Sequence, residues 1–168
     1  LRAIRRRHPE SRITVLTKAA YAPLVEDNPH VNEVIRLRPG ESLPELGARI
    51  RVAGYTHLLD LHGSLRSRLL RALAPGPWHG YPKYRAARAL LILGKRDCYP
   101  VHQPVPERYF AAARSLEVRP DGEPPEFFLG ETAVRETTAW LEAAGLGAAR
   151  PLVAVAPGAA HATKRWPV

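Results

Sequence analysis

YTHLLDLHGSLRS, Tyr55 to Ser67, holds the clearest change from strand to helix in this 168-residue sequence. The apolar run THLLDL is typical of a short buried strand. Gly63 then permits a tight turn, and Ser64 follows as a residue suited to cap a helix. A strand that turns directly into a helix is the building unit of α/β proteins with parallel sheets.

The same alternation continues on both sides of this stretch. Further strands are predicted at residues 13–16, 31–37 and 151–156, with a short one around 78–82. Helices are predicted at residues 1–7, 19–26, 43–53, 65–73, 84–93, 107–116 and 131–144. We therefore expect an α/β fold with a mostly parallel sheet. The small-residue linker before Pro151 is the best candidate for a domain boundary, so we expect one domain at 1–150 and the beginning of a second at 151–168.

Composition excludes several classes of protein. With 45% hydrophobic and 24% charged residues, the chain is too apolar to be disordered. It contains no run of about 18 uncharged apolar residues, which a transmembrane helix requires. The net charge is +9, mostly from arginine. That charge fits an anionic partner, but it also fits an arginine-rich coding bias, and composition alone leaves both explanations open.

Ligands of open α/β sheets bind beyond the carboxyl ends of the strands, and the Asp60–Ser67 corner lies at such an end. Its turn offers backbone amides, a hydroxyl and a helix N-terminus, which together suit an anion. Arg66 lies in the first turn of the helix, from which it could bind a carboxylate or phosphate in bidentate fashion. The alternative is that Asp60 and Ser64 only cap the helix.

A second corner follows the predicted strand at 151–156. Gly158 allows a ligand close to the backbone, while Thr163, Lys164 and Arg165 offer a hydroxyl and positive charge. Pro167 suits the first position of a helix, whose positive end would face the same space. This pattern fits a pyrophosphate site, and the alternative is a plain surface loop.

Other chemistry has little support in the sequence. The histidines are scattered and form no metal-binding motif, and no GxSxG elbow is present. Cys98 has no motif around it and is interpreted as a bystander. Arg85 and Arg88 share one helix face and fit either a groove for an acidic substrate or a solvated surface. Basic residues are not interleaved with aromatic ones, so nucleic acid is not an expected partner.

Four stretches together resemble the ADP-heptose:lipopolysaccharide heptosyltransferase family, glycosyltransferase family 9. They are residues 13–35 (ITVLTKAAYAPLVEDNPHVNEVI), 55–67 (YTHLLDLHGSLRS), 79–91 (HGYPKYRAARALL) and 153–167 (VAVAPGAAHATKRWP). The last of these and the DLHGSLRS corner are the most specific.

The resemblance implies a GT-B fold, in which two Rossmann-like domains face each other. Residues 1–150 would form the N-terminal, acceptor-side domain, and 151–168 would begin the C-terminal domain that binds the nucleotide sugar. The implied activity is inverting transfer of a heptose from ADP-heptose to the lipopolysaccharide inner core, without a cofactor or a metal. The implied location is the cytoplasm, with peripheral contact at the inner membrane.

Site residues carry over from the family only where this sequence matches it. Thr163 and Lys164 would contact the donor pyrophosphate, and Arg66 would contact the acceptor. The family's general-base aspartate belongs to a loop that we expect before residue 1, so no residue here is assigned as the base. We therefore expect residues 1–168 alone to be inactive. A non-catalytic α/β binding domain, or a family member that uses another sugar, is the alternative.

Overall fold

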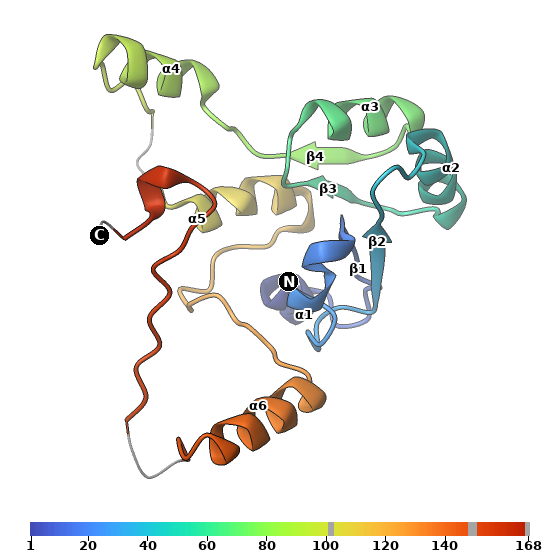
Figure 1. The fold of residues 1–168 in the computed structure, drawn as a ribbon. Coiled ribbons are helices and arrows are strands. Elements are labelled where there is room, and N and C mark those ends of the chain that lie inside the picture. Colours follow the sequence, from blue (N-terminus) through green and yellow to red (C-terminus); the bar gives the residue numbers. More distant parts are fainter. Residues whose placement is uncertain (101–102, 148–150, 167–168) are drawn as a thin grey trace. The chain divides into compact units, whose positions relative to one another are not determined.

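The structure, a computed structural model, describes residues 1–100, 103–147 and 151–166 (Figure 1). Its contacts divide the chain into two compact units, Leu1–Phe128 and Leu129–Val168. None of the described helices combines the length and apolar character needed to cross a bilayer.

The first unit alternates strands and helices, as the sequence predicts. Its strands are β1 (Thr14–Lys18), β2 (Glu33–Leu37), β3 (Leu58–Asp60) and β4 (Trp78–Gly80). Its α-helices are α1 (Arg2–Arg7), α2 (Leu43–Ala53), α3 (Leu65–Leu73), α4 (Arg85–Gly94) and α5 (Val105–Tyr109). Two 3-10 helices complete it, η1 (Ala19–Leu24) and η2 (Phe110–Leu116).

All described strands pair in parallel, which confirms the expected strand direction. The sheet is divided into two pairs, β1 with β2 and β3 with β4. Thr14 lies opposite Glu33 in the first pair, and Leu58 lies opposite Trp78 in the second. Parallel pairs place the carboxyl ends of both strands at one edge, so β3 and β4 end side by side (Figure 1).

Local sequence signals set the bounds of α2 and α3. The Ser42 hydroxyl accepts a hydrogen bond from the Glu45 amide at the start of α2, and Gly54 ends that helix in the left-handed conformation, with φ of 63°. The Ser64 hydroxyl accepts from the Ser67 amide at the start of α3. Both helices begin and end where the sequence predicts, because capping residues mark helix ends directly.

The core of the first unit lies where α2 and α3 pack against the strands. Its buried residues share an aliphatic character and are Ile35, Leu46, Ile50, Leu70 and Ala74. Trp78 of β4 packs against this cluster, and its indole N–H donates to the Ala74 carbonyl at 2.7 Å. The core therefore fixes the end of α3 relative to β4.

Arginine side chains join α1 to the rest of the unit. The Arg5 guanidinium donates to the carbonyls of Ser11 and His30 and to the Asn32 side chain. Arg2 pairs with Asp121 at 2.8 Å and lowers the pKa of that carboxyl to about 2. These contacts hold both ends of the unit's sequence together without a large apolar interface.

The second unit contains α6 (Glu131–Ala143) and a short 3-10 turn, η3 (Ala162–Lys164). The strand predicted at residues 151–156 is wrong. That segment is described, pairs with no other described strand, and leaves Val153 85% exposed. An apolar run needs a neighbouring strand to satisfy its backbone, and residues 129–147 and 151–166 provide none.

The division between the units falls at Phe128, ahead of residue 150, where we expect the domain boundary. The difference concerns α6, which groups with the second unit by contacts. The boundary at residue 150 remains a prediction.

Gly47 permits the close packing of α2 on α3. A Cβ atom at Gly47 would lie 2.8 Å from the Leu73 Cβ and 3.3 Å from its carbonyl. We predict that Gly47→Ala lowers the free energy of unfolding by about 1–3 kcal/mol, although alanine has the higher helix propensity. Urea denaturation of the variant measures this loss.

Gly94→Ala is the matched control, because no atom lies within 4 Å of a Cβ at that position of α4. It should be neutral or slightly stabilising. Equal effects of the two substitutions would contradict the close approach of α2 and α3.

Candidate functional site

Asp60 is the buried carboxylate at the carboxyl end of β3, with a relative exposure of 6%. Its Oδ1 accepts hydrogen bonds from the amides of His62 at 2.9 Å and Gly63 at 2.7 Å. Its Oδ2 accepts from the Arg71 guanidinium at 3.0 Å. One side chain therefore joins the end of β3, the following turn and the last turns of α3.

The turn itself depends on Gly63, whose φ is +51°. A Cβ atom there would also lie 3.0 Å from the Lys83 Cε. The glycine thus serves both the backbone reversal and the approach of a cation from the segment after β4. Ser64 then begins α3, as the corner sequence predicts.

A hollow of about 330 Å³ opens at this corner, over the adjoining ends of β3 and β4. Its lining is rich in cations and comes from both strand ends: Asp60, Gly63, Arg68, Arg71, Gly80, Tyr81, Lys83, Tyr84 and Arg85. Asp60 is the single acidic residue among them. The hollow therefore has the charge expected of a site for an anionic ligand.

Two of the cations are held by backbone carbonyls of the turn. Lys83 donates to the His62 carbonyl, and Arg85 donates to the Gly63 carbonyl at 2.7 Å. Carbonyl partners orient these groups without neutralising their charge. Arg71 differs, because Asp60 pairs with it.

Titration behaviour separates Asp60 from a catalytic base. Burial alone would raise its pKa, but the hydrogen bonds from Gly63 and His62 and the charge of Arg71 outweigh burial and hold the pKa of Asp60 below its usual value. An ionised carboxylate with these partners has little tendency to accept a proton near neutral pH. Its role here is structural, which agrees with leaving it unassigned as the base.

Tyr81 closes one side of the hollow. Its ring packs edge-on against Tyr109, with 4.9 Å between centroids, and the Lys83 ammonium lies 5.9 Å from the Tyr81 centroid. Burial raises the pKa of the Tyr81 hydroxyl. A side-chain hydrogen bond with Tyr109 acts in the same direction, so the phenol stays protonated near pH 7.

The predicted site residues fall in separate places. Arg66 is exposed beside the corner, and its guanidinium reaches the Glu41 carbonyl at 3.4 Å; it does not line the hollow. Thr163 and Lys164 lie in the exposed η3 turn of the second unit, where the Lys164 amide donates to the His161 carbonyl at 2.9 Å. Pro167 lies outside the described residues.

Two local hydrogen bonds close the second corner, residues 157–166. The Trp166 amide donates to the Pro157 carbonyl at 3.0 Å, and the Arg165 guanidinium donates to the Ala159 carbonyl at 2.9 Å. Residues 157–166 therefore form a closed loop with Thr163 and Lys164 on its exposed surface. Whether this loop binds pyrophosphate is a prediction.

Sequence reasoning missed Arg71 and Lys83, and it left Arg85 between two interpretations. The structure places Arg85 at the hollow, while Arg88 is not among its lining residues. A signal was present: no acidic residue occurs between Asp60 and Asp97, a stretch that contains many cations. Lys83 and Arg85 also follow β4 closely. They therefore lie beyond the carboxyl end of a strand, where ligands of open α/β sheets bind.

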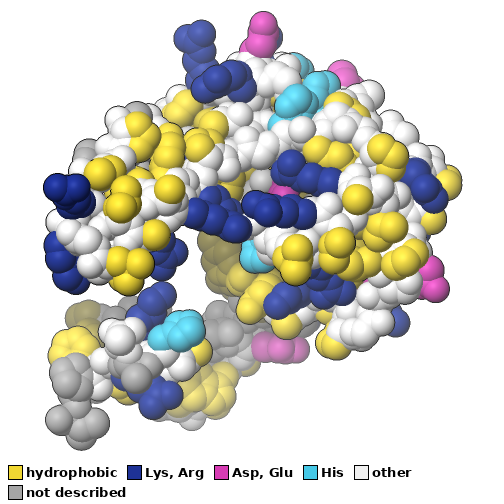
Figure 2. Space-filling model, turned by 90° about the horizontal axis from the view of Figure 1, so that it is seen from above, with side chains coloured by type: hydrophobic (Ala, Val, Ile, Leu, Met, Phe, Trp, Pro, Cys, Tyr) yellow, Lys and Arg dark blue, Asp and Glu magenta, His cyan; other side chains and the backbone are white. Residues whose placement is uncertain are grey.

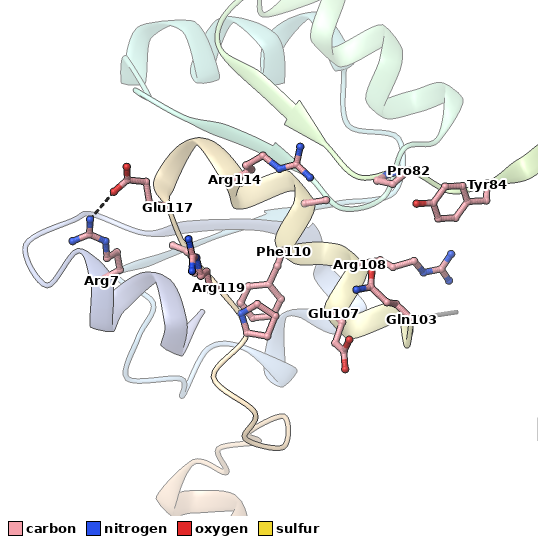
Figure 3. Close-up of a pocket in the computed structure, with 13 residues that line it drawn as sticks. Arg7, Pro82, Tyr84, Gln103, Glu107, Arg108, Phe110, Arg114, Glu117 and Arg119 are labelled. Atoms are coloured by element: carbon pink, nitrogen blue, oxygen red, sulfur yellow. Dashed lines mark hydrogen bonds and ion pairs between the residues drawn. The ribbon is translucent and has the colours of Figure 1, made fainter. Parts of the chain in front are cut away.

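A larger hollow of about 870 Å³ lies along α5 and η2 (Figure 3). It contains Arg108 and Arg114, but Glu107 and Glu117 also line it, and Arg7 pairs with Glu117 at 2.6 Å. Its charge is thus partly balanced, and none of its lining residues belongs to a strand. We favour the smaller hollow as the functional site because two strand ends build it and its excess of cations is larger.

In the part of the chain that the structure describes, no three His, Cys, Asp or Glu side chains lie close enough together to bind a metal ion. The arrangement at β3 and β4 can instead orient and bind an anionic group.

A parallel α/β unit with a cationic hollow beyond its strand ends has the architecture of a Rossmann-like domain, in which ligands bind at that edge of the sheet. The chain belongs to glycosyltransferase family 9 (heptosyltransferase), whose sequence model matches residues 44–168.

Curated relatives carry the name lipopolysaccharide heptosyltransferase 2. The protein from Salmonella typhimurium is 29% identical over 99% of this chain and 51% of its own length. That from Escherichia coli K12 is 28% identical with the same coverage. The chain thus spans about half the length of the curated relatives it matches.

Solved structures agree with this grouping. A family 9 glycosyl transferase from Veillonella parvula superposes with a TM-score of 0.73 at 19% identity, over 99% of this chain and 50% of that one. The E. coli ADP-heptose LPS heptosyltransferase II gives 0.63 at 28% identity, over 99% and 51%. The predicted fold class, α/β of the GT-B type, is confirmed, apart from the strand at 151–156.

Replacement of Asp60 tests its structural role. We predict that Asp60→Ala lowers the free energy of unfolding by about 3 kcal/mol at pH 7, because it leaves Arg71 and two turn amides without their partner. A carboxyl with a lowered pKa stabilises the fold above its unfolded pKa, about 3.9, and this stability is lost as the pH falls through the folded value. The difference between wild type and variant should therefore shrink below about pH 4.

Urea denaturation from pH 3 to 7 measures this dependence. The exposed Asp27→Ala is the control and should stay within about 0.5 kcal/mol of wild type. A loss for Asp60→Ala that is the same at pH 3 and pH 7 would contradict an ionised, hydrogen-bonded Asp60.

Proposed function

We propose that the protein is an inverting glycosyltransferase that moves a heptose from ADP-heptose to the lipopolysaccharide inner core. The family match supports the class of reaction, and the names of the relatives support the sugar and the acceptor. The observation that carries the proposal is the cationic hollow at the ends of β3 and β4.

This hollow suits the acceptor side of the reaction. The inner core of lipopolysaccharide carries acidic sugars and phosphates, so its binding site needs fixed positive charge. Lys83 and Arg85 supply that charge and are already oriented by the turn carbonyls. Oriented charges lose little freedom on binding, which favours affinity and positioning.

Arg66 extends the same surface outside the hollow. Its contact with the Glu41 carbonyl is long, at 3.4 Å, and the side chain is exposed. The guanidinium is therefore available for bidentate binding of a carboxylate or phosphate of the acceptor.

The donor side is assigned to Thr163 and Lys164. Glycosyl transfer releases a diphosphate whose negative charge grows in the transition state, and a fixed ammonium stabilises such charge. Both side chains are exposed on the closed loop at 157–166, which supports their access to a nucleotide sugar. Residues 151–168 would begin the nucleotide-sugar domain, and the domain boundary near residue 150 is part of this proposal.

A non-catalytic binding domain with the same fold is the second candidate. It is favoured by one observation: the only acidic residue that lines the hollow, Asp60, is bound on both oxygens. A transferase assay of the full-length protein with ADP-heptose and a truncated lipopolysaccharide acceptor decides between the two. Turnover supports the enzyme, and binding of the acceptor without turnover supports the binding domain.

Arg66→Ala should raise KM for the acceptor about tenfold and leave KM for the donor nearly unchanged, because it removes a charged hydrogen-bond donor from the acceptor side. Steady-state kinetics with each substrate varied in turn measures both constants. Arg51→Ala removes an exposed arginine from the last turn of α2 and serves as the control. A larger change in KM for the donor than in KM for the acceptor would contradict the assignment of Arg66 to the acceptor side.

Lys164→Ala should weaken binding of the nucleotide sugar by about 1.5–3 kcal/mol, the range for hydrogen bonds to charged groups. Calorimetric titration of the folded protein with ADP-heptose measures this loss. Arg135→Ala, a charge change on α6 in the same unit, is the control. Unchanged donor affinity in Lys164→Ala would remove this residue from the site.

A further inference from the structure

Tyr84 stands between Lys83 and Arg85, two cations that line the hollow, and its backbone conformation is unusual. Its φ is 46° and its ψ is 43°, in the left-handed region. Among the described residues, Lys95 and Glu117 also have positive φ without being glycine, and each of them follows the end of a helix. Left-handed residues are ordinary at a helix end, whereas the residue before a helix normally has an extended backbone. Tyr84 therefore holds a strained conformation at the start of α4.

The residue type does not explain this conformation. Ser42 and Ser64 precede α2 and α3 with extended backbones, and their hydroxyls accept amide hydrogen bonds from the helix. The Tyr84 side chain makes no such capping bond to α4 as the structure describes it. Tyrosine is also a bulky residue, for which a left-handed backbone is unfavourable. Positions that break local preferences in this way are expected at functional sites, where surrounding contacts maintain them.

Contacts of the ring maintain the conformation of Tyr84. The guanidinium carbon of Arg108, in α5, lies 5.9 Å from the centroid of the Tyr84 ring, and Figure 3 shows the Arg108 side chain extending below that ring in its view. The Tyr99 ring packs edge-on against Tyr84, with 6.0 Å between centroids. Cation–π and edge-to-face contacts are both attractive. The ring thus connects the start of α4 to α5 and to the segment that follows α4.

The residues on either side of Tyr84 reach the same turn. Lys83 donates to the His62 carbonyl, and Arg85 donates to the Gly63 carbonyl at 2.7 Å. These carbonyls are consecutive, so the backbone at Tyr84 sets the direction of one cation relative to the other. Figure 2 shows lysine and arginine side chains gathered where the lobe of α4 meets the rest of the first unit.

Burial contributes little to holding the start of α4. Among the ten residues of this helix, Ala87 alone is buried. Figure 1 shows α4 projecting from the first unit after β4. A rotation of the backbone at Tyr84 would therefore move Arg85 out of the hollow while exposing little apolar surface. The ring contacts of Tyr84 oppose that rotation.

We propose that Tyr84 is a positioning residue of the acceptor site: its left-handed backbone, held by the contacts of its ring, keeps Lys83 and Arg85 at the hollow before the acceptor binds. This inference rests on the proposed role of the hollow in acceptor binding. Cations that are already in place lose less freedom on binding than mobile ones, which favours affinity. Tyr84 acts through the two cations and needs no contact of its own with the acceptor.

Calorimetric titration of the full-length protein with a deacylated, truncated lipopolysaccharide acceptor, in the absence of donor, tests this role. Tyr84→Gly retains the left-handed backbone but removes the ring, so the affinity for the acceptor should fall about tenfold as both cations become mobile. Tyr84→Phe retains the ring and should bind within about twofold of wild type. The midpoint of urea denaturation verifies that each variant is folded.

A background without the two cations, Lys83→Ala with Arg85→Ala, separates positioning from direct contact. If Tyr84 acts through these cations, Tyr84→Gly should weaken acceptor binding in this background by less than about twofold, because the effects of coupled residues do not add.

Lys95→Gly is the matched control. It places glycine at a left-handed residue at the other end of α4, outside the lining of the hollow, and also removes a positive charge. This variant should bind the acceptor like wild type. An equal loss in Lys95→Gly and Tyr84→Gly would assign the effect to the stability or charge of α4 and would overturn the proposal.

Three further results would overturn it. One is equal affinity of Tyr84→Gly and wild type. Another is a loss in Tyr84→Phe as large as that in Tyr84→Gly, which would assign the effect to the hydroxyl. The third is a full tenfold loss from Tyr84→Gly in the background without the cations, which would make Tyr84 a direct contact for the acceptor.

A failure of the proposed function gives a different pattern. Wild type that does not bind the acceptor contradicts the acceptor role of the hollow, and the role of Tyr84 with it. Binding without turnover contradicts only the transferase reaction, and the pattern among the variants then still decides whether Tyr84 positions the cations.

Discussion

The carboxylate of Asp60 is the contact on which the corner of the first unit depends. It accepts hydrogen bonds from two turn amides and from the Arg71 guanidinium. These bonds connect β3, the turn and α3. The turn carbonyls then face Lys83 and Arg85. The buried charge of Asp60 thus organises a hollow whose other charged residues are cations, and the candidate anion site shares residues with the contacts that stabilise the corner.

The surroundings of this corner follow from the same constraint. The carboxyl ends of β3 and β4 lie side by side because the pair is parallel. Leu58 of β3 and Trp78 of β4 both pack against the apolar core formed with α2 and α3. Chain segments more than ten residues apart are thereby brought to one hollow. After β4 the chain continues through Lys83 into α4, which begins at Arg85.

Much of this arrangement could be predicted from the sequence, where local signals are strong. The bounds of α2 and α3 follow from Ser42, Gly54 and Ser64, and the corner after Asp60 follows from Gly63. The convergence of Arg71 and Lys83 could not, because their approach depends on how α3 packs against β4. The prediction of a strand at 151–156 was wrong for a related reason. Its residues have the apolar pattern of a buried strand, but none of the described strands pairs with them.

The acceptor-side role of the hollow is the central claim, and hydrogen exchange of the full-length protein tests it most directly. Exchange is measured with and without a soluble acidic sugar of the inner-core type. The account predicts slower amide exchange in peptides covering residues 60–67 and 80–86, where the turn, Lys83 and Arg85 meet. Protection confined to the hollow along α5 and η2, or no protection in the first unit, would contradict it.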